Sequence, residues 1–264
     1  MKIAAVLPAY NEETRVRNVV SAVLRAPSID EVIVVNDGSN DRTADVVRSI
    51  PGIDLIDLPL NTGKGGAMTA GAEATDADII VFLDADLIGL KPEHVEALIA
   101  PVRCGRAKMA VGSFRGGRKL TDWAQRITPN ITGQRAIRRD IWEQIPNLDH
   151  ARYGVEMAIT RFCHYYRVTT AIVPIPGVTH PMKEEKLGYV RGLISRAYMY
   201  KEIFKILIDL RAPRRIRPRR RSLIRTIAAT RRRMGKPTRA TDWLYRRELN
   251  WRRRRREERS SRKR

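Results

Sequence analysis

The feature that most constrains the fold of this chain is a regular alternation of short apolar segments with segments of helical character. Five runs rich in Val, Ile, Leu and Ala predict buried strands, at residues 2–7, 31–35, 54–58, 79–83 and 109–112. Between them, apolar or small side chains at helical spacing predict helices, at residues 12–24, 41–50, 63–74 and 92–102. Because neighbouring parallel strands need a crossover connection, this order predicts an α/β fold with a mostly parallel sheet flanked by helices.

The pattern becomes less regular after the fifth apolar run. Helices are predicted at residues 138–145 and 155–166, a last strand at 171–174 and a long helix at 185–210. Near the start of the chain, Asn11 is the predicted N-cap of the first helix, since its side chain can accept a hydrogen bond from a free backbone amide.

Polar residues directly follow three of the predicted strands, at residues 8–12, 36–39 and 84–86. Ligands of open α/β sheets bind at the carboxyl ends of the strands, so we expect these segments to meet at one edge. Asp84 and Asp86 suit a divalent cation such as Mg²⁺ or Mn²⁺, which prefers oxygen ligands. A helix N-cap or a solvated loop is the alternative for this pair.

Composition favours a folded chain in a reducing compartment. The chain has 264 residues, 43% of them hydrophobic, which is enough for a large core without disulfides. Cys104 and Cys163 are the only cysteines and do not form a metal-binding motif. No apolar run is long enough for a membrane-spanning helix, and the first residues do not resemble a signal peptide. These observations predict a cytoplasmic protein.

Four motifs occur in a fixed order along the first part of the chain. They are Pro-Ala-Tyr-Asn-Glu at residues 8–12, Val-Val-Asn-Asp-Gly-Ser at 34–39, Gly-Lys-Gly-Gly at 63–66 and Asp-Ala-Asp at 84–86. In order and spacing they resemble the family 2 glycosyltransferases of GT-A fold, including polyprenyl-phosphate glycosyltransferases and glucosyl-3-phosphoglycerate synthases. The resemblance covers roughly residues 1–180. It implies a Rossmann-like nucleotide-diphospho-sugar transferase that works with Mg²⁺ or Mn²⁺.

The resemblance also implies roles for individual residues. Those expected to bind the nucleotide sugar are Pro8, Tyr10, Glu12, Asp37, Lys64, Asp84 and Ala85, with Asp86 as a metal ligand. The carboxylate of Asp37 can accept hydrogen bonds from a base, and the glycines beside Lys64 let the backbone approach an anion closely. The alternatives are an exposed turn lysine for Lys64 and packing beside the first helix for Tyr10.

Further site residues are expected in the second half of the chain. Glu156 ends a Tyr-Gly-Val-Glu motif that resembles the segment beside the acceptor, and it is the candidate base or acceptor-orienting group. His180 matches the place of an additional metal ligand in some relatives. Thr132, Gly133 and Arg135 belong to the expected acceptor loop, which can hold a phosphate. The alternatives are a helix-surface glutamate for Glu156 and an ordinary loop residue for His180.

The resulting hypothesis is a metal-dependent glycosyltransferase that uses UDP-glucose or GDP-mannose and a lipid-linked or phosphorylated acceptor. Inverting transfer with Glu156 as the base is the default. Retaining transfer stays open, because residues 154–156 and His180 are also similar to the retaining enzymes that glucosylate phosphoglycerate. The competing hypothesis is a non-catalytic, transferase-like scaffold that binds polyanions through a basic tail.

The net charge of +22 is concentrated at the end of the chain. Residues 211–264 hold 24 of the 51 basic residues and 4 of the 29 acidic ones, so this tail carries +20 and the rest +2. We expect a transferase domain at residues 1–182, an amphipathic helix at 183–210 and a partly disordered Arg-rich tail. The helix and the tail suit the anionic inner face of a membrane, where the protein would bind peripherally. Packing of the helix on its own sheet is the alternative, and nucleic acid is the second candidate partner because arginine runs bind any polyanion.

Overall fold

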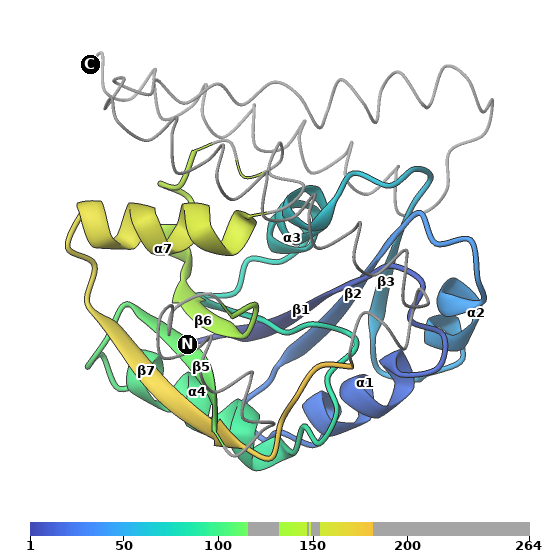
Figure 1. Cartoon of the computed structure of the whole chain (residues 1–264), viewed down its shortest axis with the longest axis horizontal. Coiled ribbons are helices and arrows are strands. Elements are labelled where there is room, and N and C mark those ends of the chain that lie inside the picture. Colours follow the sequence, from blue (N-terminus) through green and yellow to red (C-terminus); the bar gives the residue numbers. More distant parts are fainter. Residues whose placement is uncertain (116–131, 147, 149–153, 182–264) are drawn as a thin grey trace, which may run out of the picture. The chain divides into compact units, whose positions relative to one another are not determined.

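The computed structural model describes residues 1–115, 132–146, 148 and 154–181 (Figure 1). They all belong to the first of two compact units, Met1–Arg219. The expected amphipathic helix and the Arg-rich tail lie outside the described residues, so these two segments stay predictions. Within the described part of the chain, no helix is long and apolar enough to cross a membrane.

A seven-stranded sheet forms the centre of the domain. Its strands are β1 (Ile3–Ala9), β2 (Glu31–Asp37), β3 (Asp54–Leu58), β4 (Ile79–Phe82), β5 (Met109–Arg115), β6 (Arg135–Arg138) and β7 (Thr170–Pro176). They lie in the order β3-β2-β1-β4-β6-β5-β7, and all neighbouring pairs are parallel except the two that involve β6. The predicted α/β fold with a mostly parallel sheet is confirmed.

Helices cover both faces of this sheet (Figure 1). They are α1 (Val16–Leu24), α2 (Thr43–Arg48), α3 (Lys64–Glu73), α4 (Pro92–Arg103), α6 (Arg139–Trp142) and α7 (Val155–Tyr165). α3 packs on β1 and β2, whereas α4 packs on β5, β6 and β7 and also contacts α1. In Figure 1, α3 and α7 lie on one side of the sheet and α1 and α4 on the other. The main core lies between the sheet and α1 and α4, and its β1 members are Ile3, Ala5, Leu7 and Ala9.

Small side chains let α3 lie close to the other face. A Cβ atom on Gly71 would come within 2.3 Å of Val6 Cγ1 and 3.0 Å of Val35 Cγ2. All three residues are buried. Lys64 is the first residue of α3, so the close packing of this helix on the sheet also fixes the position of Lys64.

Two local predictions were wrong. Residues 135–138 form strand β6, where the sequence indicated a loop that leads into a helix. β6 has only four residues and begins and ends with arginine, so it lacks the apolar pattern by which the other strands were found. Asn11 does not cap α1, which begins only at Val16. Instead, Asn11 has a left-handed backbone with φ of 56°, as part of a longer loop after β1.

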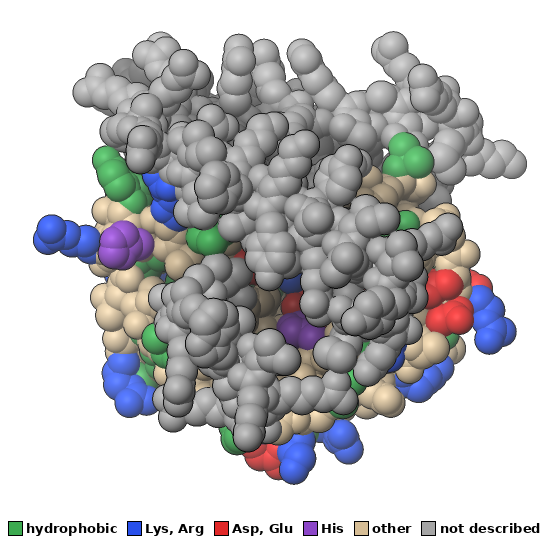
Figure 2. Space-filling model, viewed as in Figure 1, with side chains coloured by type: hydrophobic (Ala, Val, Ile, Leu, Met, Phe, Trp, Pro, Cys, Tyr) green, Lys and Arg blue, Asp and Glu red, His purple; other side chains and the backbone are tan. Residues whose placement is uncertain are grey.

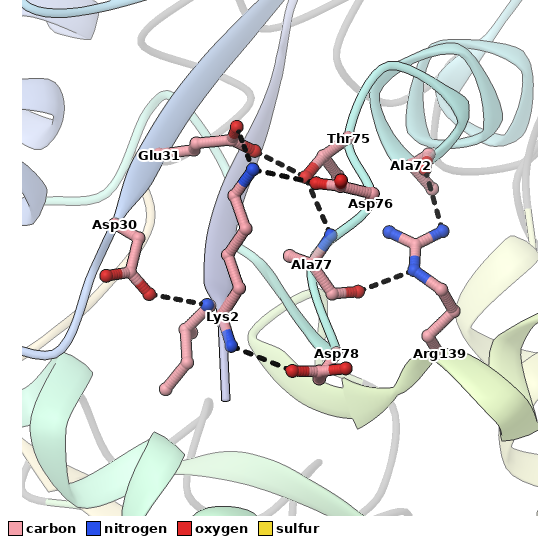
Figure 3. A network of polar contacts seen from close by, with 10 residues as sticks. Lys2, Asp30, Glu31, Ala72, Thr75, Asp76, Ala77, Asp78 and Arg139 are labelled. Carbon is pink, nitrogen blue, oxygen red and sulfur yellow. Dashed lines mark hydrogen bonds and ion pairs between the residues drawn. The ribbon is translucent and has the colours of Figure 1, made fainter.

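A polar network fastens the amino ends of β1, β2 and β4 (Figure 3). Lys2 Nζ forms ion pairs with Glu31 Oε1 at 2.5 Å and with Asp76 Oδ1 at 2.7 Å. The backbone amide of Lys2 donates a hydrogen bond of 2.8 Å to Asp78 Oδ2. This network ties together the edge of the sheet that lies opposite the carboxyl ends of the parallel strands.

Candidate active site

The loops after β1 and β2 meet at the carboxyl edge of the sheet. The backbone amide of Asn11 donates to Ser39 Oγ at 2.9 Å, and Asn11 Oδ1 accepts a hydrogen bond of 2.9 Å from the Asn40 amide. The backbone amide of Glu12 donates to Thr43 Oγ1 at 2.8 Å. The two polar segments predicted to meet are therefore in contact. β4 is parallel to β1, so the Asp-Ala-Asp segment follows it at the same edge.

Three side chains that can bind a metal ion lie together at this edge. His180 Nδ1 is 3.0 Å from Asp86 Oδ1, and His180 Nε2 is 3.6 Å from Asp84 Oδ2. One ligand atom from each residue lies within 4.8 Å of the other two. In Figure 2, histidine, acidic and basic side chains are visible together near the centre of the face that is drawn. Burial alone would lower the pKa of His180, but the hydrogen bond to Asp86 and the charges of both carboxylates raise it.

A short bridge between two distant segments brings Asp86 and His180 together. The backbone amide of Ile88 donates to the Thr179 carbonyl oxygen at 2.9 Å, and the Thr179 amide donates back to the Ile88 carbonyl oxygen at 3.1 Å. Gly89 follows with φ of 78°, and a Cβ atom there would lie 2.4 Å from the Gly177 carbonyl oxygen. This close backbone contact fixes the relative position of the two ligand-bearing segments.

Lys64 links two carboxylates that come from separate parts of the chain. Its Nζ lies 2.5 Å from Asp84 Oδ1 and 2.6 Å from Glu156 Oε1. Burial alone would lower the pKa of Lys64, but the two carboxylates raise it well above its usual range. Lys64 is therefore a permanent cation at the centre of the site. It is not the exposed turn lysine that the sequence left open.

Glu156 lies in the first turn of α7, two residues after Gly154, which has φ of 96°. Burial alone would raise the pKa of Glu156, but Lys64 and the backbone at the helix N-terminus, with a smaller contribution from Arg135, lower it to about 2. A carboxylate with such a low pKa binds protons weakly. In this arrangement Glu156 is the counter-ion of Lys64, and its role as the catalytic base stays a prediction.

Asp37 is buried at the end of β2, and its carboxylate faces the loop before α3. Its Oδ1 accepts hydrogen bonds from the Thr62 amide at 2.7 Å and from Thr62 Oγ1 at 2.8 Å, and its Oδ2 accepts one from the Gly63 amide at 2.9 Å. These bonds position the residues that lead directly into Lys64. The predicted contact between Asp37 and a base stays a prediction.

Four other residues expected at the nucleotide lie along the same edge. Pro8 is half-buried in β1, Tyr10 is 43% exposed, and Ala85 is buried. Glu12 is half-buried and begins the turn that precedes α1. The exposure of Tyr10 leaves its ring accessible for stacking, and the nucleotide roles of all four stay predictions.

The residues expected to bind the acceptor lie directly beside the acidic cluster. Thr132 is buried and donates from Oγ1 to the Gly112 carbonyl oxygen at 2.6 Å, and the buried Arg135 donates from Nε to the Thr132 carbonyl oxygen at 3.0 Å. Burial lowers the pKa of Arg135 to about 10 despite the nearby acidic groups. A Cβ atom on Gly133 would lie 2.4 Å from Asp84 Oδ2, so only glycine fits there without a shift. The acceptor roles of Thr132, Gly133 and Arg135 stay predictions.

Sequence reasoning missed one residue of this cluster. Gln134 is fully buried, and its Nε2 donates a hydrogen bond of 3.0 Å to Asp84 Oδ2. Its place between Gly133 and Arg135 in the expected acceptor loop was the only signal. A neutral amide offers no charge or motif by which it could be recognised.

The sequence as a whole matches a known family. Residues 4–164 match the model described as glycosyl transferase family 2. The glucosyl-3-phosphoglycerate synthase of Mycobacterium tuberculosis is 29% identical over 195 residues, which covers 60% of this chain and 59% of that protein. The undecaprenyl-phosphate 4-deoxy-4-formamido-L-arabinose transferase of Pseudomonas aeruginosa is 32% identical over 130 residues, 46% of this chain and 38% of that protein. The match thus spans less than two thirds of each of these relatives.

Solved structures agree with this result. The M. tuberculosis synthase in complex with Mn²⁺, UDP and glucosyl-3-phosphoglycerate superposes with a TM-score of 0.58 at 27% identity, covering 74% of this chain and 79% of that one. The same enzyme with Mg²⁺ and UDP gives a TM-score of 0.59 over the same shares. The predicted GT-A fold is confirmed. With a family model that matches more than half of its length, the chain belongs to glycosyl transferase family 2.

Proposed function

We propose that this protein is a metal-dependent glycosyltransferase that moves a sugar from a nucleotide diphosphate donor to a phosphorylated acceptor. The observation that carries the proposal is the cluster of Asp84, Asp86 and His180 at the carboxyl edge of the sheet. Two carboxylates and an imidazole suit Mg²⁺ or Mn²⁺, and the histidine favours Mn²⁺. The neighbouring solved structures contain Mn²⁺ or Mg²⁺ together with UDP, which supports the same choice here.

UDP-glucose is the donor we favour, with GDP-mannose as the alternative. The M. tuberculosis synthase has been solved with UDP-glucose and phosphoglyceric acid bound, and this supports a small phosphorylated acid as the acceptor. A polyprenyl-phosphate acceptor is the second candidate, because the P. aeruginosa relative is named for transfer to undecaprenyl phosphate. Both candidate acceptors contain a phosphate group, which would bind beside the basic residues of the site.

The charge of each residue of the site determines the role that we assign to it. Asp86 and His180, with Asp84 beside them, would hold the metal ion, which would neutralise the charge that develops on the departing diphosphate. Lys64 supplies a second, permanent positive charge at the donor. Glu156 holds Lys64 in place and orients the acceptor hydroxyl. Because its pKa is low, Glu156 is a weak proton acceptor, and we assign it this orienting role in place of that of a base. Whether the anomeric configuration is inverted or retained depends on the face of the anomeric carbon that the acceptor hydroxyl attacks, relative to the departing diphosphate.

The test is calorimetric titration of the purified protein with UDP-glucose, GDP-mannose and the free nucleotides. We expect one nucleotide to bind in the presence of Mn²⁺ and to lose its affinity after chelation or in Asp86→Ala. Asp140→Ala is the matched control, because Asp140 is exposed and pairs with Arg138 at the opposite edge of the sheet. Nucleotide binding that is independent of metal, or silent in Asp86→Ala, would support the non-catalytic scaffold instead.

A further inference from the structure

We propose that Gln134 is a positioning residue that fixes the Asp84 carboxylate for the metal ion and the nucleotide sugar. The inference rests on the proposed function and adds a residue that contacts neither the donor nor the acceptor in that proposal. Gln134 directly precedes β6, so the short strand between β4 and β5 places its side chain beside the Asp-Ala-Asp segment.

The Asp84 carboxylate is held by a different group at each oxygen. Lys64 Nζ lies 2.5 Å from Oδ1, and Gln134 Nε2 donates to Oδ2 at 3.0 Å. Oδ2 is also the atom that faces His180 Nε2, at 3.6 Å. Two donors on opposite oxygens fix the rotation of the carboxyl group, so Oδ2 stays directed at the cluster that would hold the metal ion.

The chemical type of Gln134 matters as much as its position. A second lysine or arginine at this place would cancel the negative charge of Asp84 and would repel an incoming cation. The amide of Gln134 donates a hydrogen bond without adding charge. Since Lys64 is shared between Asp84 and Glu156, the carboxylate of Asp84 keeps most of its attraction for a metal ion.

Gln134 is also a costly residue for the fold. Its Oε1 is buried and accepts no hydrogen bond from the described residues. A buried unsatisfied carbonyl oxygen is unfavourable, and an apolar side chain of the same size would avoid that penalty. The neighbouring Gly133 points the same way, because only a residue without Cβ allows this backbone to lie so close to Asp84. The Gln134 side chain thus keeps its hydrogen bond to Asp84 while its own Oε1 accepts none from the described residues.

The test compares Gln134→Leu and Gln134→Met with Gln144→Leu in the 264-residue chain. Gln144 is a matched control because it is an exposed glutamine whose Nε2 donates to the Asp140 carbonyl oxygen, away from the site. For each protein, binding of Mn²⁺ together with UDP is measured by calorimetry, and the midpoint of thermal unfolding is measured separately. We expect the two Gln134 variants to bind Mn²⁺ and UDP about tenfold more weakly. Their unfolding midpoints should equal or exceed that of the wild type, and Gln144→Leu should match the wild type in both measurements.

The outcomes separate this inference from the proposed function. If the wild type does not bind Mn²⁺ and UDP, the proposed function fails and this inference fails with it. If the wild type binds and both Gln134 variants bind equally well, only the inference is overturned. A loss of folding in both variants, or a fall in the unfolding midpoint that parallels the loss of affinity, would also overturn it, because Gln134 would then be a structural residue.

Discussion

Lys64 and Glu156 show how single charges shape the site. Each is buried enough that its charged form would be disfavoured alone, and each is stabilised by the other. Together with Asp84 they form a chain of alternating charge that links the start of α3, the segment after β4 and the start of α7. Charges held by such pairs are fixed in direction, which is what electrostatic stabilisation of a bound anion requires.

The pKa of Glu156 predicts how stability depends on pH. In the folded protein this pKa is lowered from 4.5 to about 2, so the unfolded chain takes up the proton more readily. The stabilising contribution is complete above pH 4.5 and is lost as the pH falls toward 2, by at most roughly 3 kcal/mol. We expect Glu156→Gln to flatten the fall in unfolding free energy between these two pH values, measured by urea denaturation.

Glu143→Gln is the control for this measurement. Glu143 is exposed, and its oxygen lies 4.0 Å from Arg139, a distance at which an ion pair contributes little. This variant should keep the wild-type dependence on pH. Equal acid slopes for Glu156→Gln and the wild type would show that Lys64 does not hold Glu156 ionised.

At the residue level, the sequence predicted the charged and metal-binding groups but not their pairing. Asp84 and Asp86 were expected at the site from the Asp-Ala-Asp motif after a buried strand, and His180 from the resemblance to relatives with an additional metal ligand. The ion pair between Lys64 and Glu156 joins the start of α3 to the start of α7, and no local pattern reports such a contact. Gln134 was missed because a neutral amide can be assigned a role only from its contacts in the folded structure.

At the level of the elements, Gly89 controls how the segment after Asp86 meets the segment before His180. Gly89→Ala places a Cβ atom 2.4 Å from the Gly177 carbonyl oxygen and forces a left-handed backbone on alanine. We expect the bridge between Ile88 and Thr179 to open and the affinity for Mn²⁺ to fall about tenfold as Asp86 and His180 separate. A Mn²⁺ titration in the presence of UDP measures this effect.

Gly105→Ala is a close control, because Gly105 has φ of 75° and open space where a Cβ atom would lie. Both variants carry the same backbone strain of about 1–2 kcal/mol. Only Gly89→Ala adds a collision near the site. If the two variants bind Mn²⁺ equally well, the bridge does not position the ligands.

The packing of α3 gives a second prediction for the elements. Gly71→Ala would bring a Cβ atom within 2.3 Å of Val6 Cγ1 in a buried layer, and overpacking of this kind costs roughly 1–3 kcal/mol. Removing the obstructing methyl groups in Val6→Ala should restore part of this loss. The double variant should therefore lose less unfolding free energy than the two single variants lose together. Urea denaturation of the four proteins tests this, and strict additivity would argue against the contact.

The sequence predicted most elements because their periodicity is local. Strand β3 was predicted with its observed limits, and α4 was predicted to within one residue. β6 was missed because its strand character comes from its neighbours, since β4 and β5 pair with it on both sides. Its short and partly charged sequence carries no strand signal of its own.

At the scale of the whole molecule, two separate polar clusters lie at opposite edges of one sheet. The amino edge is fastened by Lys2 and its acidic partners (Figure 3). The carboxyl edge carries the cluster of Asp84, Asp86 and His180. Lys2→Met should lower the unfolding midpoint only slightly, since solvent screens exposed ion pairs and they contribute little to stability. Its affinity for Mn²⁺ and UDP should be unchanged, and a weakened affinity would mean that the two edges are coupled.

The Arg-rich tail at 211–264 allows the two kinds of acceptor to be distinguished. Every residue of the proposed site lies between residues 8 and 180, whereas the tail carries +20 of the net charge of +22. Deletion of the tail should leave the affinity for Mn²⁺ and UDP and the turnover of a soluble phosphorylated acceptor unchanged. Sedimentation with vesicles that contain anionic lipid, and turnover of a lipid-linked acceptor in them, should both weaken, because each basic residue near such a surface contributes about 1 kcal/mol. Raising the salt concentration for the intact protein is the control, since screening should weaken vesicle binding in the same way. If the deletion instead abolishes turnover of the soluble acceptor, the tail is part of the catalytic unit and its charge serves the reaction itself.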